Sequence, residues 1–266
     1  VMLGLDIFKK SDFRWSLDLN ATFFRNKITK MPKDSDGNPQ EIINGTKKLS
    51  EGHSIYEFWL REYAGVDPED GSALYYKDIE DGNGNVTGRE TTKDQNVAGY
   101  YYMGDAIPDL YGGFTNSFSY KGFDLSVFFS YQIGGKMYDS NYASLMHPGS
   151  FGTHWSADIK NRWQKPGDIT DVPRLQNSYP AANAASSRWL VNASYLALKN
   201  VTLSYTLPKP IQNKLDMKGC KVFLTGDNLF LLCKRKGMDP QQSFNGTSDY
   251  TYVPNRVVSL GINVTF

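Results

Sequence analysis

Apolar and polar residues alternate along several segments of the chain, and the last segment shows the pattern most clearly. Every second position of residues 257–266, VVSLGINVTF, is apolar: Val258, Leu260, Ile262, Val264 and Phe266. Successive side chains of a β-strand point to opposite faces, so this segment has one apolar face and one face of mostly small polar residues. The same alternation occurs in residues 15–24, WSLDLNATFF, and 123–133, FDLSVFFSYQI. These three patterns predict strands.

Further strands are expected where apolar and aromatic residues gather between turn sequences. They are residues 2–8, 54–63, 73–78, 111–120, 196–207 and 220–232. Lys121 and Gly122 separate two of the predicted strands and are typical of a two-residue hairpin turn. With the three clear segments, the sequence predicts about nine antiparallel strands.

The connections between these strands alternate between short and long. The short connections are residues 9–13, 66–72, 121–122 and 208–219, and the long ones are 29–53, 79–110, 134–191 and 233–253. An up-and-down sheet with this alternation carries its short turns at one end and its long loops at the other. That is the architecture of outer-membrane β-barrels.

The alternative is a soluble β-sandwich with one face in its core. Strands of about ten residues match a tilted bilayer crossing. Aromatic residues also stand at strand ends, where the interfacial girdle of a barrel would lie: Trp15, Tyr120, Tyr131 and Tyr205. These features favour an all-β transmembrane barrel with an apolar face toward lipid and a polar face toward the lumen.

Composition and charge narrow the range of partners. The chain has 29 basic and 28 acidic residues, a formal net charge of +1, and its basic residues are scattered, so no nucleic-acid partner is expected. Cys220 and Cys233 lack metal-binding spacing, and two free thiols are favoured over a disulfide. No apolar run of about 18 residues predicts a transmembrane helix. Val1 begins a segment that already has the pattern of a strand, so we expect a piece of a longer chain.

Candidate catalytic and metal-binding motifs fail on spacing. Asp34 and Asp81 begin loops that resemble the start of a calcium loop, but neither loop has the glycine and glutamate that an EF-hand requires. His53, His147 and His154 lie in expected loops, without the helical carboxylate pattern of zinc hydrolases. The sequence contains no nucleophile elbow, P-loop or GxGxxG motif. It therefore predicts no enzyme, no metal site and no cofactor.

Aromatic residues of the long loops are the candidate ligand-binding residues: Tyr100, Tyr101, Tyr102, Trp155, Trp163 and Trp189. Flat aromatic rings suit the apolar face of a sugar, with polar groups nearby to orient it. The alternative is that these side chains pack within their own loops or against a partner protein. For any single residue of the set, this second interpretation is favoured.

Several segments resemble the SusC/RagA family of TonB-dependent outer-membrane transporters, in the C-terminal part of the barrel. They include FRWSLDLNATFFRNKITKMP (13–32), REYAGVDPEDGSALYY (61–76) and GDAIPDLYGGFTNSFSYKGFDLSVFFSYQIGGKMYD (104–139). Residues 195–209, 221–232 and 237–241 match in the family's order. The resemblance implies a barrel of roughly 22 strands closed around a plug. Nine strands counted back from the C-terminus would make the first strand here the fourteenth, running inward.

The resemblance also implies a function and partners. Members of this family import oligosaccharides or peptides together with a SusD-like surface lipoprotein, and the TonB complex drives them through an N-terminal part that this chain lacks. We expect oligosaccharide uptake. The alternatives are uptake of peptides, of a siderophore or of cobalamin by a related TonB-dependent receptor, and a non-transport adhesin barrel. Phe266 resembles the terminal aromatic residue of the outer-membrane assembly signal.

Overall fold

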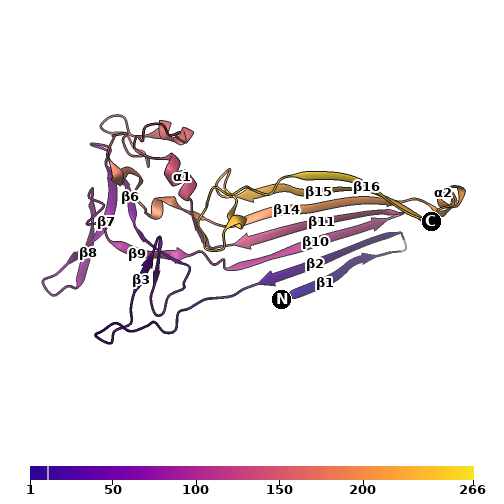
Figure 1. The fold of residues 1–266 in the computed structure, drawn as a ribbon, viewed down its shortest axis with the longest axis horizontal. Helices are drawn as coiled ribbons and strands as arrows, with labels where there is room; N and C mark the ends of the chain where they lie inside the picture. Colours follow the sequence, from indigo (N-terminus) through magenta and orange to yellow (C-terminus); the bar gives the residue numbers. More distant parts are fainter. Residues whose placement is uncertain (11) are drawn as a thin grey trace.

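A computed structural model describes residues 1–10 and 12–266. In this part of the chain, the long strands form one antiparallel sheet of seven strands, in the order β1-β2-β10-β11-β14-β15-β16 (Figure 1). Their bounds are β1 (Met2–Lys9), β2 (Phe13–Thr22), β10 (Leu110–Tyr120), β11 (Phe123–Ile133), β14 (Tyr195–Thr206), β15 (Gly219–Cys233) and β16 (Val257–Thr265). Each strand pairs with the sheet strand that precedes or follows it along the chain, so the sheet is an up-and-down meander.

The two ends of this sheet differ, as the sequence predicts. At the short-turn end, β10 and β11 join through residues 121–122, and β14 and β15 join through a connection that contains α2 (Lys209–Lys214). The predicted turn 9–13 includes Ser11, which lies outside the described residues. At the long-loop end, residues 23–109, 134–194 and 234–256 form what we call the loop assembly. The C-terminus lies at the short-turn end, beside α2 (Figure 1).

The predicted count of nine strands in this sheet is wrong. Residues 54–63 and 73–78 form β5 (Glu57–Arg61), β6 (Tyr63–Val66) and β7 (Ala73–Glu80), which lie in the loop assembly. β5 and β6 have five and four residues, too few to cross a bilayer. The turn 66–72 is therefore also at the long-loop end. Removing two strands keeps the direction of β1, which would be the sixteenth strand instead of the fourteenth in the barrel of about 22 strands that the resemblance implies.

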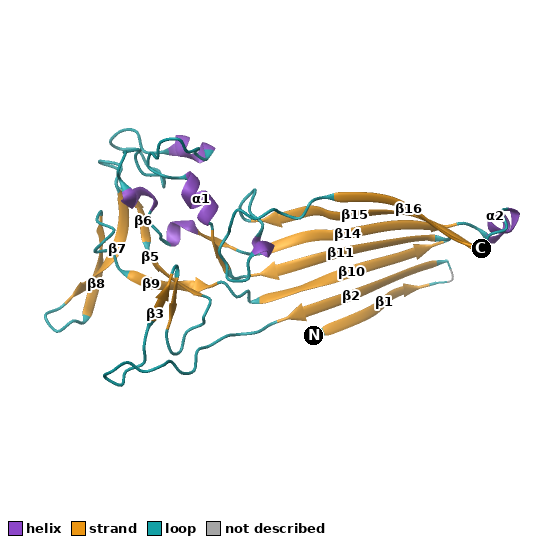
Figure 2. Ribbon diagram, viewed as in Figure 1, coloured by secondary structure: helices purple, strands orange, loops and turns teal. Residues whose placement is uncertain are grey.

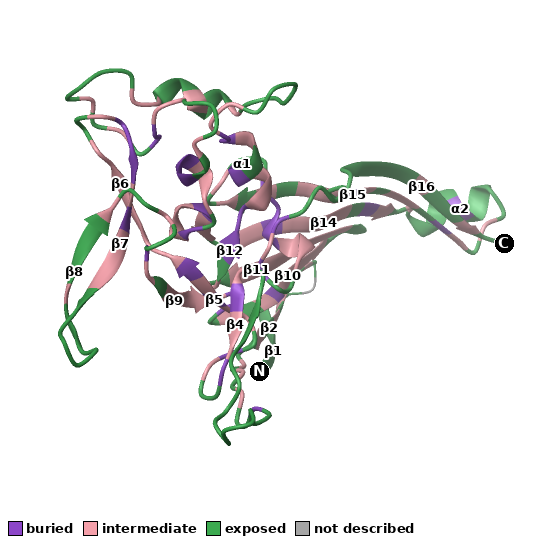
Figure 3. Ribbon diagram, turned by 60° about the vertical axis from the view of Figure 1, so that its left-hand side comes forward, coloured by how far each residue is buried: buried purple, intermediate pink, exposed green. Residues whose placement is uncertain are grey.

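One face of the sheet is apolar across all seven strands. Leu125, Leu203, Leu224 and Leu260 occupy paired positions on β11, β14, β15 and β16. Leu203 is 43% exposed and Leu260 is 77% exposed, and no second layer covers this face within the described residues (Figure 3). A soluble sandwich would bury these leucines in its core. The open apolar face is instead the one that a barrel presents to lipid.

The opposite face is polar. Lys221 Nζ lies 3.2 Å from Asp124 Oδ2, and Asn200 Nδ2 donates to Asp227 Oδ1 at 2.7 Å. Phe223 also lies on this face, flat against the backbone of its paired residue Gly261. A Cβ atom at Gly261 would lie 2.3 Å from the Phe223 ring, so only glycine leaves room for it.

The loop assembly contains the short strands, α1 and the 3₁₀ turns (Figure 2). Its sheets are β3 (Ile42–Asn44), β4 (Lys47–Leu49), β5 and β9 (Tyr100–Asp105); β6, β7 and β8 (Val86–Thr92); and β12 (Lys136–Tyr138) with β13 (Leu190–Asn192). Its helices are α1 (Ser140–Leu145) and the 3₁₀ turns η1 (Ala157–Asn161), η2 (Pro180–Asn183), η3 (Ser187–Trp189) and η4 (Pro240–Gln242). Across residues 1–10 and 12–266, no helix is both long and apolar enough to cross a bilayer.

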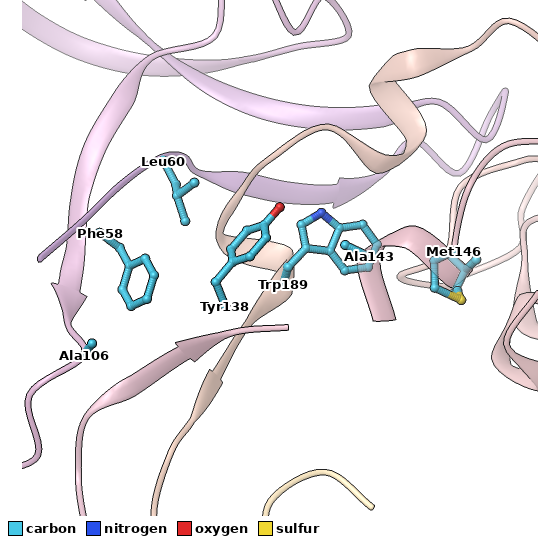
Figure 4. Close-up of a cluster of buried hydrophobic side chains, with 8 residues drawn as sticks. Phe58, Leu60, Ala106, Tyr138, Ala143, Met146 and Trp189 are labelled. Atoms are coloured by element: carbon cyan, nitrogen blue, oxygen red, sulfur yellow. The ribbon is translucent and has the colours of Figure 1, made fainter. Parts of the chain in front are cut away.

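The main hydrophobic core lies in the loop assembly, away from the seven-stranded sheet. Phe58 and Leu60 of β5, Tyr138 of β12 and Trp189 of η3 pack together, with Met146 just after α1 (Figure 4). Phe58 and Trp189 are completely buried. These residues come from two different long loops, so hydrophobic burial fixes those loops to each other.

Candidate functional site

A cavity of about 680 Å³ opens in the loop assembly between α1 and residues 234–256. The two sides of the cavity come from different loops. Tyr142 and Asp158 line it from residues 134–194; the loop between β15 and β16 contributes Arg235, Lys236, Asp249, Tyr250 and Tyr252. Its size is in the range of small-molecule binding sites.

Asp139 joins the two sides of the cavity. Its side chain caps the N-terminus of α1 by accepting from the Tyr142 backbone N–H at 3.1 Å, and it also accepts from Ser248 Oγ at 3.2 Å. Its other oxygen lies 2.9 Å from Arg235 Nε. The side chain is only 5% exposed, and a buried carboxylate needs such partners to offset its desolvation. Asp139 therefore holds the cavity in shape and is not available to a ligand.

A cation and a phenol lie side by side in the cavity. The Arg235 guanidinium is 3.7 Å from the centre of the Tyr142 ring, a close cation–π contact. The Tyr142 hydroxyl donates to Asp158 Oδ2 at 2.8 Å. Burial and this hydrogen bond raise the pKa of Tyr142, so the phenol remains a neutral donor.

Three exposed side chains line the cavity: Lys236, Tyr250 and Tyr252. Lys236 is exposed and makes no ion pair within the described residues. Tyr250 is 74% exposed and Tyr252 is fully exposed. The cavity thus offers a free ammonium group, carboxylates and two open aromatic rings to an incoming molecule.

Of the three predicted tryptophans, only Trp155 offers substantial exposed surface. Trp189 is completely buried, and its indole N–H donates to the Ala184 carbonyl at 2.9 Å. As a core residue it has no surface for direct ligand contact, which corrects its place among the candidates. Trp163 lies against Gly71 and donates to the Pro68 carbonyl at 3.0 Å.

Trp155 keeps part of its ring open. It is 45% exposed, its ring stacks on His147 with centroids 5.1 Å apart, and its N–H donates to the His147 carbonyl at 3.0 Å. A ligand role for Trp155 stays a prediction.

The three predicted tyrosines lie on β9, next to an aromatic residue that sequence reasoning missed. Trp59 of β5 lies between Tyr100 and Tyr102, with ring centroids 6.3 and 4.7 Å away. Tyr102 also stacks on His53 at 3.6 Å, whereas the Tyr101 hydroxyl donates to Asp78 at 2.7 Å. Tyr100, at 40% exposed, is the most open of the three. We call Trp59, Tyr100 and Tyr102 the aromatic row.

Phe266 lies directly after β16 at the short-turn end and is 77% exposed. Its role as an assembly signal stays a prediction.

Sequence reasoning also missed most residues of the cavity. Tyr142, Arg235 and Lys236 carry no local signal, because they meet only when two distant loops fold together. The spacing of Tyr250 and Tyr252 in a loop is the one signal that could have marked the site.

Comparisons with known proteins agree on one family. The chain is 30% identical to TonB-dependent receptor P3 of Formosa agariphila over 96% of its own length, and 27% identical to TonB-dependent receptor SusC of Bacteroides thetaiotaomicron, also over 96%. It covers 27% and 25% of these relatives, so it spans about a quarter of their length. No protein-family model matches the chain.

A solved structure of the RagAB peptide transporter matches the fold. The superposition has a TM-score of 0.84 at 27% identity and covers 100% of this chain and 28% of that one. The relatives are receptors and transporters of the outer membrane, and the open apolar face of the sheet agrees with that location. The chain belongs to the SusC/RagA family of TonB-dependent outer-membrane transporters and corresponds to the C-terminal part of their β-barrel.

Proposed function

We propose that the full-length protein imports an oligomeric nutrient across the outer membrane, and that the cavity between α1 and residues 234–256 meets part of this cargo. In this proposal residues 1–266 are one unit, the C-terminal part of the barrel. The plug and the earlier strands belong to the rest of the protein, through which TonB acts. A SusD-like surface lipoprotein is the expected partner, and the name RagAB of the similar transporter supports a two-component assembly.

The charge of the cavity supports short peptides as cargo. Lys236 offers an ammonium group to a carboxylate, and Asp158 and Asp249 offer carboxylates to an amine. A peptide carries both charges at its termini and often in its side chains, whereas a neutral oligosaccharide carries neither. The similar transporter RagAB is described as a peptide importer, which agrees with this assignment.

Oligosaccharide uptake, which the sequence analysis favours, is the second candidate here. Exposed Tyr250 and Tyr252 favour it, because open aromatic rings at a polar cavity suit sugar faces. Against it, several of the aromatic residues predicted to bind a sugar pack within the protein instead. Trp189 is in the core and Trp163 lies on Gly71.

Binding measurements on the full-length transporter with its lipoprotein partner can separate the two. Isothermal titration with mixed short peptides and with neutral oligosaccharides gives the cargo class directly. If peptides bind at the cavity, Lys236→Gln should weaken binding of peptides with a free C-terminal carboxylate by roughly ten- to hundredfold, since a hydrogen bond to a charged group contributes roughly 1.5–3 kcal/mol. The matched control is Lys165→Gln, an exposed lysine of the loop assembly that does not line the cavity.

Each outcome decides between the candidates. Peptide binding that is lost with Lys236→Gln and kept with Lys165→Gln supports the peptide assignment. Binding of neutral oligosaccharides alone, weakened by Tyr252→Ala, supports the second candidate. Binding of either class that neither cavity variant changes would refute the cavity as a contact site.

A further inference from the structure

The short-turn end of the sheet concentrates positive charge. The three connections at this end, residues 9–13, 121–122 and 207–218, contain two aspartates and six lysines: Lys9, Lys10, Lys121, Lys209, Lys214 and Lys218. All six lysines are exposed. Lys9 lies 3.7 Å from Asp6, and the other five make no ion pair within the described residues. The whole chain is nearly neutral, so this excess is a local feature.

A band of four aromatic residues, distinct from the aromatic row of the loop assembly, borders these lysines on the apolar face. Phe13, Tyr120, Phe123 and Tyr205 occupy paired positions on β2, β10, β11 and β14. The Phe123 and Tyr205 rings are 4.3 Å apart. Aromatic residues favour the boundary between lipid chains and headgroups, so this band marks where the bilayer surface crosses the strands.

Two of these lysines lie close to aromatic rings. Lys121 Nζ lies 5.3 Å from the centre of the Tyr120 ring, and Lys10 Nζ lies 5.4 Å from that of Phe8. A lysine in such a position packs its methylene groups along apolar surface and holds its charge at headgroup level.

The connection that contains α2 exposes both apolar and basic side chains. Ile211 is 46% exposed and Leu215 is 58% exposed, one helical turn apart, and neither packs into a core. Lys209 precedes Ile211, and Lys214 lies between Ile211 and Leu215. Buried Gln212 holds α2 against the residue that follows β14, by donating from Nε2 to the Leu207 carbonyl. Exposed apolar residues among lysines are typical of helices that lie in the membrane interface.

From these observations we infer that the short-turn end is a binding surface for anionic glycerophospholipids of the periplasmic leaflet, with α2 resting in the headgroup layer. The lysines bind the lipid phosphates, and Ile211 and Leu215 enter the acyl boundary. The surface continues the apolar face that already meets lipid, and its charge is complementary to such headgroups. The inference depends on the outer-membrane location and is independent of the cargo.

Native mass spectrometry of the delipidated full-length transporter tests this inference. The protein is titrated with phosphatidylglycerol or with phosphatidylcholine of the same acyl chains. Wild type should bind phosphatidylglycerol preferentially. The triple variant Lys209→Gln, Lys214→Gln, Lys218→Gln should lose affinity for phosphatidylglycerol by about tenfold or more, with little change for phosphatidylcholine. The matched control replaces three exposed lysines of the loop assembly by glutamine: Lys30, Lys160 and Lys165.

Three results would overturn the inference. They are equal affinity of wild type for the two lipids, an equal loss in the control variant, or unchanged phosphatidylglycerol binding in the triple variant. Should the triple variant fail to assemble, wild type alone decides. Its preference for phosphatidylglycerol should fall as salt rises, because the interaction is electrostatic. A preference that salt does not change, or lysine-dependent capture of an acidic periplasmic protein without any lipid preference, would also exclude the inference.

Discussion

Replacing Trp189 by alanine should open the loop assembly and leave the barrel strands in place. Trp189 is completely buried, lies 5.9 Å from the Tyr142 ring in an edge-to-face arrangement, and donates to the Ala184 carbonyl at 2.9 Å. Its core cluster contains no residue of the seven-stranded sheet among the described residues. The damage should therefore be confined to the loops.

The expected cost can be worked from these contacts. Truncating a buried tryptophan to alanine costs roughly 3–5 kcal/mol through lost burial and the cavity that remains. The Ala184 carbonyl also loses its hydrogen-bond donor, and this loss places the total cost in the upper part of that range. A cost of about 4 kcal/mol raises the open fraction of the loops by about a thousandfold. Trp155 is 45% exposed, so replacing it by alanine should cost only about 1–2 kcal/mol.

Limited proteolysis of the full-length protein in detergent measures this difference, because cleavage follows the population of the open state when closing is fast. Trp189→Ala should speed cleavage within residues 134–194 strongly, Trp155→Ala only slightly, and both should keep the heat-modifiable gel mobility of a folded barrel. Protease resistance of Trp189→Ala equal to wild type would refute the assigned core role. Loss of the folded band would show that the loops and the barrel fold as one unit.

Two further predictions concern the C-terminus and a buried lysine. Deleting Phe266 should impair insertion far more than deleting one residue from 29–53; a folded band at wild-type level on a heat-modifiable gel would contradict this. Burial lowers the pKa of Lys47 to about 8, against partial opposition from Asp105 and Glu57, so between pH 8 and 10.5 the unfolded loop binds more protons than the folded one. Hydrogen-exchange stability of β4 and β5 should therefore rise with pH across this window, and Lys47→Met should abolish the rise; an equal slope in both proteins would exclude it.

The strands of the barrel could be predicted because each has two different surroundings, lipid and lumen. That difference imposes an alternation of period two, and the pattern is strongest where the strand crosses the whole bilayer. Residues 257–266 show it almost without interruption, and β16 occupies Val257–Thr265. The prediction of residues 220–232 as a strand is confirmed by β15. Its alternation is poor because the register shifts between Asp227 and Phe230, which pair with Asn200 and Leu198 of β14.

The predicted strand count is too high because the period-two alternation cannot distinguish a barrel strand from a strand of the loop assembly. In β5, Phe58 and Leu60 are buried whereas Trp59 belongs to the aromatic row, so this strand also alternates between two environments. Its inner environment is the core of the loop assembly instead of lipid. The alternation shows that a strand has two different faces, but it does not show what covers each face. Only the length of five residues separates β5 from a bilayer-crossing strand.

The cavity could not be predicted because its parts are close in space and far apart in sequence. Asp139 and Ser248, which hold its two sides together, are 109 residues apart. The segment GVDPEDG shows the same limit within a recognised motif. Its composition predicts a turn, but the need for glycine at position 71 appears only when Trp163 is placed, since a Cβ there would lie 2.5 Å from the indole and the backbone φ is +72°. Asp67 and Asp70 of the same turn then bind Lys93 at 2.6 and 3.2 Å. This turn therefore serves as a docking point between two long loops, and its sequence is dictated by residues that lie up to a hundred positions away.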